Sequence, residues 1–216
     1  MDVAVLNELR EVVVATAVTA GKLARDMWSQ PRQISQKGFR DLVTDADIAT
    51  QQCITDAVQA CYPDHGFLTE EEDSQLPASG PIIWIIDPVD GTTNYSRQIP
   101  EFCISIAACR PTPGGYEPLA AAIYDPMRDE LFSAAQGQGA TLQIGGAAPI
   151  PMQVSTVAAT TEAVMAIDWS ASSRSRVHIM ELINKLAESS FTLRAIGTAA
   201  LAMAWVAAGR VDGYLN

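Results

Sequence analysis

The chain has 216 residues, and its 48% hydrophobic content is enough to bury a core as one domain or as two small subdomains. Its 25 acidic and 14 basic residues give a net charge of −11, which argues against a long nucleic acid as a partner. No stretch approaches the ~20 apolar residues that a membrane-spanning helix needs. We therefore expect neither a nucleic acid polymer nor a membrane as a partner, whereas a small nucleotide held through metal ions is compatible with this charge.

The first 29 residues predict a long amphipathic helix, because their apolar residues recur at helical spacing. Asp2, Glu8, Arg10 and Glu11 interrupt the apolar residues, so this segment is not a signal peptide. The four cysteines lack the CxxC spacing of metal sites, which predicts reduced thiols in a cytoplasmic protein.

Residues 41–90 hold eleven acidic residues and no Lys or Arg, whereas the rest of the chain has fourteen of each sign. Such crowding is electrostatically costly unless cations neutralise it, and hard divalent cations prefer oxygen ligands. Within this segment, an amphipathic stretch from Asp41 to about Cys61 predicts a helix. The acidic run from Glu70 to Asp73 is by itself typical of a solvated loop. The charge distribution predicts a metal site.

The short apolar run at 81–86 predicts a buried central strand that ends at Asp87, where ligands of α/β sheets collect. Asp90 follows three residues later, so both carboxylates could converge on one site. Gly91 and Thr92 then open what reads as a helix start, which favours phosphate binding. Metal-binding carboxylates beside an anion-binding turn indicate phosphoryl chemistry. A strand followed by an Asx-type turn with no site is the alternative interpretation.

Later elements follow from turn residues and periodicity. Strands are predicted at 102–110, 117–124, 130–135, 162–167 and 192–195, and helices at 174–189 and 198–208. Glycines and prolines between 137 and 151 predict a boundary between an N-terminal metal-binding subdomain, 1–148, and a C-terminal subdomain, 149–216. Periodicity alone supports an α/β or α+β fold.

Three motifs together resemble the inositol monophosphatase family, the magnesium-dependent, lithium-sensitive phosphatases: DLVTDAD (41–47), FLTEE (67–71) and WIIDPVDGTTNY (84–95). YDPMRDELFSAAQGQGA (124–140) and GTAALAMAWVAAGRVDGY (197–214) are weaker matches, so the resemblance spans nearly the whole chain. It implies a layered αβαβα sandwich of the type shared with fructose-1,6-bisphosphatase, usually assembled as a homodimer. It also implies two or three Mg²⁺ ions per site.

The resemblance also implies roles for individual residues. Glu70, Asp87 and the carbonyl of Val89 resemble ligands of a first metal, and Asp87 and Asp90 those of a second. Asp47 and Thr92 resemble the pair that orients the attacking water, with Glu70 also at the catalytic centre. The residues that resemble substrate contacts are Glu70, Val89, Asp90, Gly91, Thr92, Gly197, Thr198, Ala199 and Asn216.

The chain also departs from the family pattern. Family members continue into a Trp-Asp motif whose Asp completes the second metal site, whereas this sequence stops at Asn216. We expect the sequence to be a fragment, and the alternative is a protein that lacks this ligand. Asn216 itself stands where many inositol-directed members have an acid, which weakens the inferred inositol specificity.

Three functions compete. The first is magnesium-dependent hydrolysis of a small phosphate monoester such as inositol monophosphate by a metal-activated water. The second is the same chemistry on fructose 1,6-bisphosphate, a 3′-phosphoadenosine nucleotide or histidinol phosphate. The third is a non-catalytic metal-binding homologue. The expected partner is thus a small phosphorylated metabolite.

Overall fold

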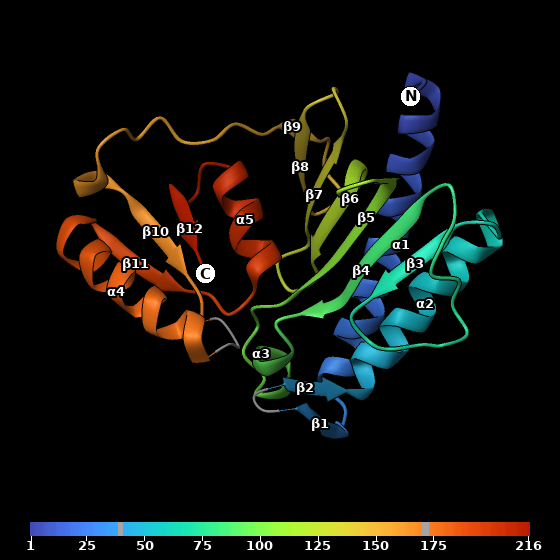
Figure 1. Cartoon of the computed structure of the whole chain (residues 1–216), viewed down its shortest axis with the longest axis horizontal. Helices are drawn as coiled ribbons and strands as arrows, with labels where there is room; N and C mark the ends of the chain where they lie inside the picture. Colours follow the sequence, from blue (N-terminus) through green and yellow to red (C-terminus); the bar gives the residue numbers. More distant parts are fainter. Residues whose placement is uncertain (39–40, 170–172) are drawn as a thin grey trace.

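The computed structural model describes residues 1–38, 41–169 and 173–216, which form five stacked layers (Figure 1). The helices are α1 (Val3–Trp28), α2 (Asp45–Cys61), α3 (Thr92–Ser96), α4 (Ser173–Ser189) and α5 (Ala199–Ala207), with a 3₁₀ turn at Thr160–Glu162. The strands are β1 (Ile34–Gly38), β2 (Asp41–Thr44), β3 (Gly66–Thr69), β4 (Ile83–Asp90), β5 (Cys103–Thr112), β6 (Gly115–Asp125), β7 (Glu130–Ala135), β8 (Ala140–Ile144), β9 (Ile150–Pro151), β10 (Val164–Ile167), β11 (Thr192–Ala195) and β12 (Gly213–Leu215).

The larger sheet has seven strands in the order β3-β4-β5-β6-β7-β8-β9. β3 and β4 run parallel, and every later neighbour is antiparallel. The C-terminal ends of β3 and β4 therefore meet at one edge of the sheet, which is where Glu70 and Asp87 lie.

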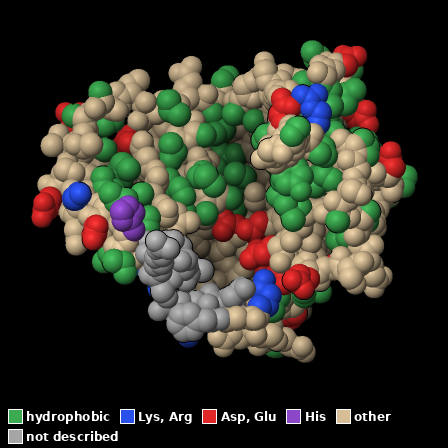
Figure 2. All heavy atoms as spheres, viewed as in Figure 1, with side chains coloured by type: hydrophobic (Ala, Val, Ile, Leu, Met, Phe, Trp, Pro, Cys, Tyr) green, Lys and Arg blue, Asp and Glu red, His purple; other side chains and the backbone are tan. Residues whose placement is uncertain are grey.

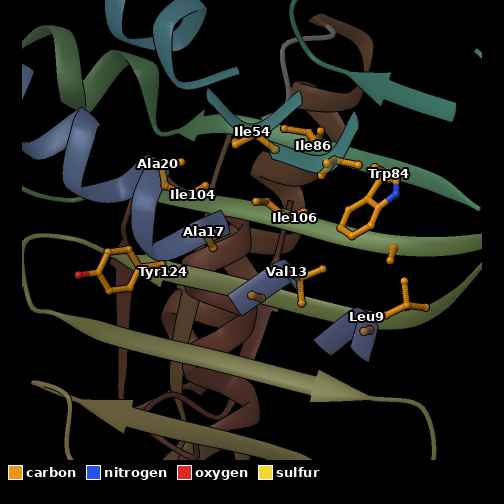
Figure 3. Packing of buried hydrophobic residues seen from close by; sticks show 14 of the residues in the cluster. Leu9, Val13, Ala17, Ala20, Ile54, Trp84, Ile86, Ile104, Ile106 and Tyr124 are labelled. Atoms are coloured by element: carbon orange, nitrogen blue, oxygen red, sulfur yellow. The ribbon is translucent and has the colours of Figure 1, made fainter. Parts of the chain in front are cut away.

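The main core lies between this sheet and the helices α1 and α2, which contact the same face (Figure 3). Leu9, Val13 and Ala17 of α1 are buried against strand residues that include Ile104 and Ile106 (Figure 3). The helix also carries Gly21, where a Cβ atom would overlap the Tyr124 ring. A glycine at this position therefore allows α1 to approach β6 closely.

The smaller sheet has three parallel strands in the order β11-β10-β12. Helix α5 contacts both the larger sheet and β12, and α4 contacts β11 on the outer side (Figure 1). The order of layers is thus α1 and α2, the seven-stranded sheet, α5, the three-stranded sheet and α4. The predicted layered αβαβα fold is confirmed.

Several local predictions need correction. The helix predicted from Asp41 begins at Asp45, because residues 41–44 pair with β1 as the hairpin strand β2. The strand predicted at 81–86 is second from the sheet edge rather than central, and it continues to Asp90. The predicted division after residue 148 stays a prediction: the larger sheet ends at Pro151 and the smaller sheet begins at Val164. Among the described helices, none is both long and apolar enough to cross a membrane.

Burial of His65 predicts a pH effect on stability. Its side chain is 8% exposed, its Nδ1 accepts a hydrogen bond from Trp84 Nε1 at 3.0 Å, and burial lowers its pKa. The folded state thus keeps the imidazole neutral while the unfolded chain takes up a proton near pH 6.5. The free energy of unfolding should fall as the pH drops below about 6.5, by at most about 1.4 kcal/mol per unit from this group.

The measurement is denaturant unfolding between pH 5 and 7.5, in which His65→Gln should show a shallower dependence on pH than the wild type. His178→Gln is the matched control, since that side chain is exposed on α4. A slope that is equal in the wild type and His65→Gln would contradict the assignment.

Candidate metal and phosphate site

Asp87 and Asp90 lie at the C-terminal end of β4, in the stretch where the pairing with β5 changes register. Residues three apart on a regular strand point to opposite faces of a sheet. The register shift between Asp87 and Asp90 works as a bulge, which re-aims side chains beside it. It brings the two carboxylates close enough that Asp90 raises the pKa of Asp87.

Asp87 has the environment of a metal ligand. Its Oδ1 atom is buried and has no hydrogen-bond partner among the described residues. Burial, followed by the charges of Asp90 and Glu70, raises the pKa of this carboxyl to about 9. A buried carboxylate without a donor is costly unless a cation compensates for it. The residues present therefore fit a hard divalent cation.

Glu70 follows β3 and lies beside Asp87, whose pKa it raises through charge and a hydrogen bond. Lys37 of β1 approaches the same acidic group, with its Nζ 2.7 Å from Glu71 Oε1 and 3.9 Å from Glu70 Oε1. Figure 2 shows acidic side chains gathered in a hollow at the centre of the drawn face. Among residues 1–38, 41–169 and 173–216, however, no group of three or more His, Cys, Asp or Glu side chains is arranged so that it could hold a metal ion.

Asp47 and Thr92 form a direct contact. The Thr92 hydroxyl lies 3.1 Å from Asp47 Oδ1, while Asp47 Oδ2 accepts from the hydroxyl and backbone N–H of Thr44 at 2.5 and 2.9 Å. Asp47 is fully buried at the start of α2, and burial raises its pKa against the lowering effect of these hydrogen bonds. The fixed carboxylate thus contacts the Thr92 hydroxyl, which also lies 3.1 Å from the Val89 carbonyl of β4.

The turn after Asp90 requires a glycine. Gly91 has a φ of +103°, and a Cβ atom there would lie 2.9 Å from the Glu101 carbonyl oxygen. This conformation starts α3, whose first residue is Thr92. The Val89 carbonyl, a predicted metal ligand, lies 3.1 Å from the Thr92 hydroxyl. All the predicted catalytic and metal-binding residues except Glu70 and Asp47 thus lie in one continuous stretch, from the end of β4 to the first residue of α3.

A cavity of about 670 Å³ lies next to this turn, between α3 and the C-terminal ends of β10 and β12. Its lining includes three of the predicted substrate residues, Gly197, Ala199 and Asn216. Thr198 is not part of the lining: its side chain is 1% exposed and bonds Asp90 instead. Of the nine predicted substrate residues, the cavity lining thus includes only three, and Thr198 contacts Asp90, another residue of the predicted group.

Sequence reasoning missed several residues of this cavity and its surroundings. Asp168, Trp169, Arg176 and Tyr214 line it, and Asp168 accepts hydrogen bonds from the Gly197 N–H at 3.0 Å and from the Tyr214 hydroxyl at 3.4 Å. Asp168 directly follows the strand β10, and a carboxylate at the end of a predicted strand is the same signal that pointed to Asp87. Lys37 was missed because the β1–β2 hairpin was not predicted.

Comparison with known proteins identifies the family of the chain. The model of the inositol monophosphatase family matches residues 5–216. Proteins named Nus factor SuhB from Salmonella typhimurium and Escherichia coli are 36% identical over 98% of this chain and 77% of their own length. The crystal structure of the extragenic suppressor protein suhB from Bartonella henselae has a TM-score of 0.82 at 32% identity, covering 98% of this chain and 77% of that one. An inositol monophosphatase from Anabaena has a TM-score of 0.78 at 29% identity, with 97% and 74% covered.

These names contradict the prediction that a nucleic acid polymer is not a partner, because a Nus factor is named for a role in transcription. That prediction assumed that the net negative charge is spread over the whole surface. The entire excess of acidic residues lies in residues 41–90, and the rest of the chain has equal numbers of acidic and basic residues. The net charge therefore does not show whether another face of the molecule can bind a nucleic acid. Since the family model covers nearly all of the sequence and the relatives align along its length, the chain belongs to the inositol monophosphatase family.

Proposed function

We propose that this protein hydrolyses the phosphate monoester of a small alcohol, with inositol monophosphate as the first substrate to test. The observation that carries the proposal is the Asp47–Thr92 contact, which lies beside the acidic end of β4. The next residues of α3, Thr93 and Asn94, line a cavity of about 670 Å³. Hydrolysis of a phosphate monoester is extremely slow without a catalyst, so a site for it needs both charge neutralisation and an oriented water.

Mg²⁺ is the proposed cofactor, held by Glu70, Asp87, Asp90 and the Val89 carbonyl, with two or three ions per site. When bound, it would neutralise phosphate charge and lower the pKa of a water. The oxygen-only donor set supports this choice. An IMPase/NADP phosphatase structure complexed with Mg²⁺ and phosphate is 24% identical with a TM-score of 0.75, and it shows the shared fold.

The chain's own groups orient the reactants. A hydroxyl has one proton, and Thr92 can donate it to Asp47 or to the Val89 carbonyl, each 3.1 Å away. The charged acceptor makes the stronger bond, so Thr92 keeps its lone pairs for a water proton. The N–H groups of the turn at Gly91 and Thr92 face the phosphate, and the backbone of Gly197 and Ala199 contacts the alcohol portion.

The test is phosphate release by the 216-residue chain, with and without Mg²⁺, from inositol 1-phosphate, fructose 1,6-bisphosphate, a 3′-phosphoadenosine nucleotide and histidinol phosphate. We expect Mg²⁺-dependent turnover of at least one ester and none by Asp87→Asn. Turnover that persists in the variant would contradict the proposed role of Asp87 in the site. Failure on every ester, with Mg²⁺ binding intact, would favour a non-catalytic metal-binding homologue.

A second function, in transcription, is favoured by the relatives named Nus factor SuhB. The test is a purified transcription reaction in which the chain is added to an elongating RNA polymerase. If the wild type and Asp87→Asn change elongation equally, the two functions use different parts of the molecule. If neither changes it, this second function is rejected for the chain.

A further inference from the structure

Asp90 connects the two halves of the chain across the site. Its Oδ2 atom accepts hydrogen bonds from the Thr198 hydroxyl at 2.5 Å and from the Ala200 N–H at 2.6 Å, and it lies 3.7 Å from Cys103 Sγ. Its Oδ1 atom accepts only from the Ala199 N–H, at 3.3 Å, among the described residues. A carboxylate has about four lone-pair positions. Oδ2 is therefore saturated by the first turn of α5, while Oδ1 keeps open lone pairs.

The Thr198 hydroxyl is the centre of this arrangement. Thr198 is 1% exposed and is the N-cap of α5. Its single proton goes to Asp90, so its lone pairs can accept from the Leu201 N–H at 3.4 Å, and Cys103 Sγ lies 3.5 Å away. One hydroxyl thus fixes both the start of α5 and the orientation of a carboxylate on β4.

We propose that Thr198 is a positioning residue for Asp90: it anchors Oδ2 on α5 so that Oδ1 is the oxygen presented to the metal. The inference rests on the proposed function, and it assigns the C-terminal half of the chain a part in building the metal site. Groups that orient a ligand without touching the metal typically change its affinity by 10–100-fold when they are removed. The buried hydroxyl does not face the cavity, so its role is distinct from substrate binding.

Docking of the 196–200 segment does not depend on Thr198 alone. The Asn94 side chain donates to the carbonyls of Glu101 and Ile196 at 2.8 and 2.9 Å, and Asp168 binds the Gly197 N–H. A variant without the Thr198 hydroxyl should therefore keep the segment in place. Loss of metal affinity can then be separated from loss of folding.

The experiment is calorimetric titration of the metal-free chain with Mg²⁺ and with Mn²⁺, together with thermal unfolding in EDTA. Thr198→Val keeps the volume and removes the hydroxyl, so its metal affinity should fall about 10–100-fold. Thr198→Ser restores the hydroxyl and should stay within about threefold of the wild type. Ala204→Gly is the matched control, because it weakens α5 through helix propensity without touching Asp90 and should leave the affinity unchanged.

Equal affinities in the wild type and Thr198→Val would overturn the proposal, as would an equal loss in Ala204→Gly, which would indicate a merely structural role. Binding is measured without substrate, so the expected pattern can hold even if no phosphate ester is hydrolysed. In that case the proposed activity fails and the positioning role stands. A wild-type chain that binds neither metal at millimolar concentration would overturn both.

Discussion

Asp87→Asn should abolish Mg²⁺-dependent phosphate release, since removing one strong electrostatic group from such a site costs about 10²–10³ in rate. It should also weaken Mg²⁺ binding, because a charged oxygen ligand is lost. The same variant should stabilise the metal-free fold. The buried Oδ1 of Asp87 has no donor, and Asp90 and Glu70 repel its charge. Asparagine keeps a buried polar atom at this position but carries no charge, so the gain comes from removing the desolvation cost of the charge and its repulsion by Asp90 and Glu70.

The gain in stability should depend on pH. The pKa of Asp87 is raised from 3.8 to about 9 in the folded state, so the folded chain retains a proton that the unfolded chain releases. The contribution of this group to the free energy of unfolding therefore decreases as the pH rises from about 4 to about 9. The variant Asp87→Asn has no carboxyl group at this position and does not show this decrease. In EDTA, its free energy of unfolding should therefore exceed that of the wild type by more at pH 8 than at pH 5.

The measurements are isothermal calorimetry with Mg²⁺ and denaturant unfolding in EDTA at the two pH values. Glu72→Gln is the control, because it removes one charge from an exposed position in the same acidic segment. Unchanged Mg²⁺ binding in Asp87→Asn would remove Asp87 from the metal site. A variant less stable than the wild type at pH 8 would show that the carboxyl is compensated in the folded state without a metal.

Much of the fold could be predicted because its local signals agree with its packing. The apolar spacing of the first 29 residues corresponds to α1. Gly197 and the N-cap Thr198 precede α5, and Gly209 follows it, as expected of helix start and stop signals. The β1–β2 hairpin could not be predicted in this way. Its strand β1 is exposed along its length and lacks the alternation of buried and polar residues that marks a strand.

Spacing alone suggested a candidate site only among residues that are close in sequence: Asp87, Asp90, Gly91 and Thr92 follow one another from the end of β4 to the start of α3. The distant residues Asp47 and Glu70 were predicted as part of it through the family resemblance, and their roles stay predictions. The attachment of Asp90 to α5 joins residues 108 to 110 positions apart, and no local pattern contains that information. Asp168 shows a further limit, because a carboxylate after a short strand is too common to be singled out without the fold.

Thr92→Val should lower turnover about 10²–10⁴-fold, the usual range for a group that directs proton transfer, while KM changes by less than about threefold. The hydroxyl lies 3.1 Å from Asp47 Oδ1, and Asp47 is itself fixed by two hydrogen bonds from Thr44. Valine keeps the volume of threonine but cannot orient a water. The backbone N–H of residue 92 is unchanged, so phosphate contacts through the turn are retained.

Steady-state kinetics on the best phosphate ester, with Mg²⁺ titrated separately for each variant, would check this result. Thr92→Ser should recover most of the turnover, because the Asp47 contact needs only a hydroxyl. If KM rises while turnover stays normal, Thr92 binds substrate and does not orient the water. If Mg²⁺ affinity falls in step with turnover, the hydroxyl acts instead through the Val89 carbonyl, its second acceptor at 3.1 Å. The separate Mg²⁺ titration therefore decides which of the two acceptors gives Thr92 its function.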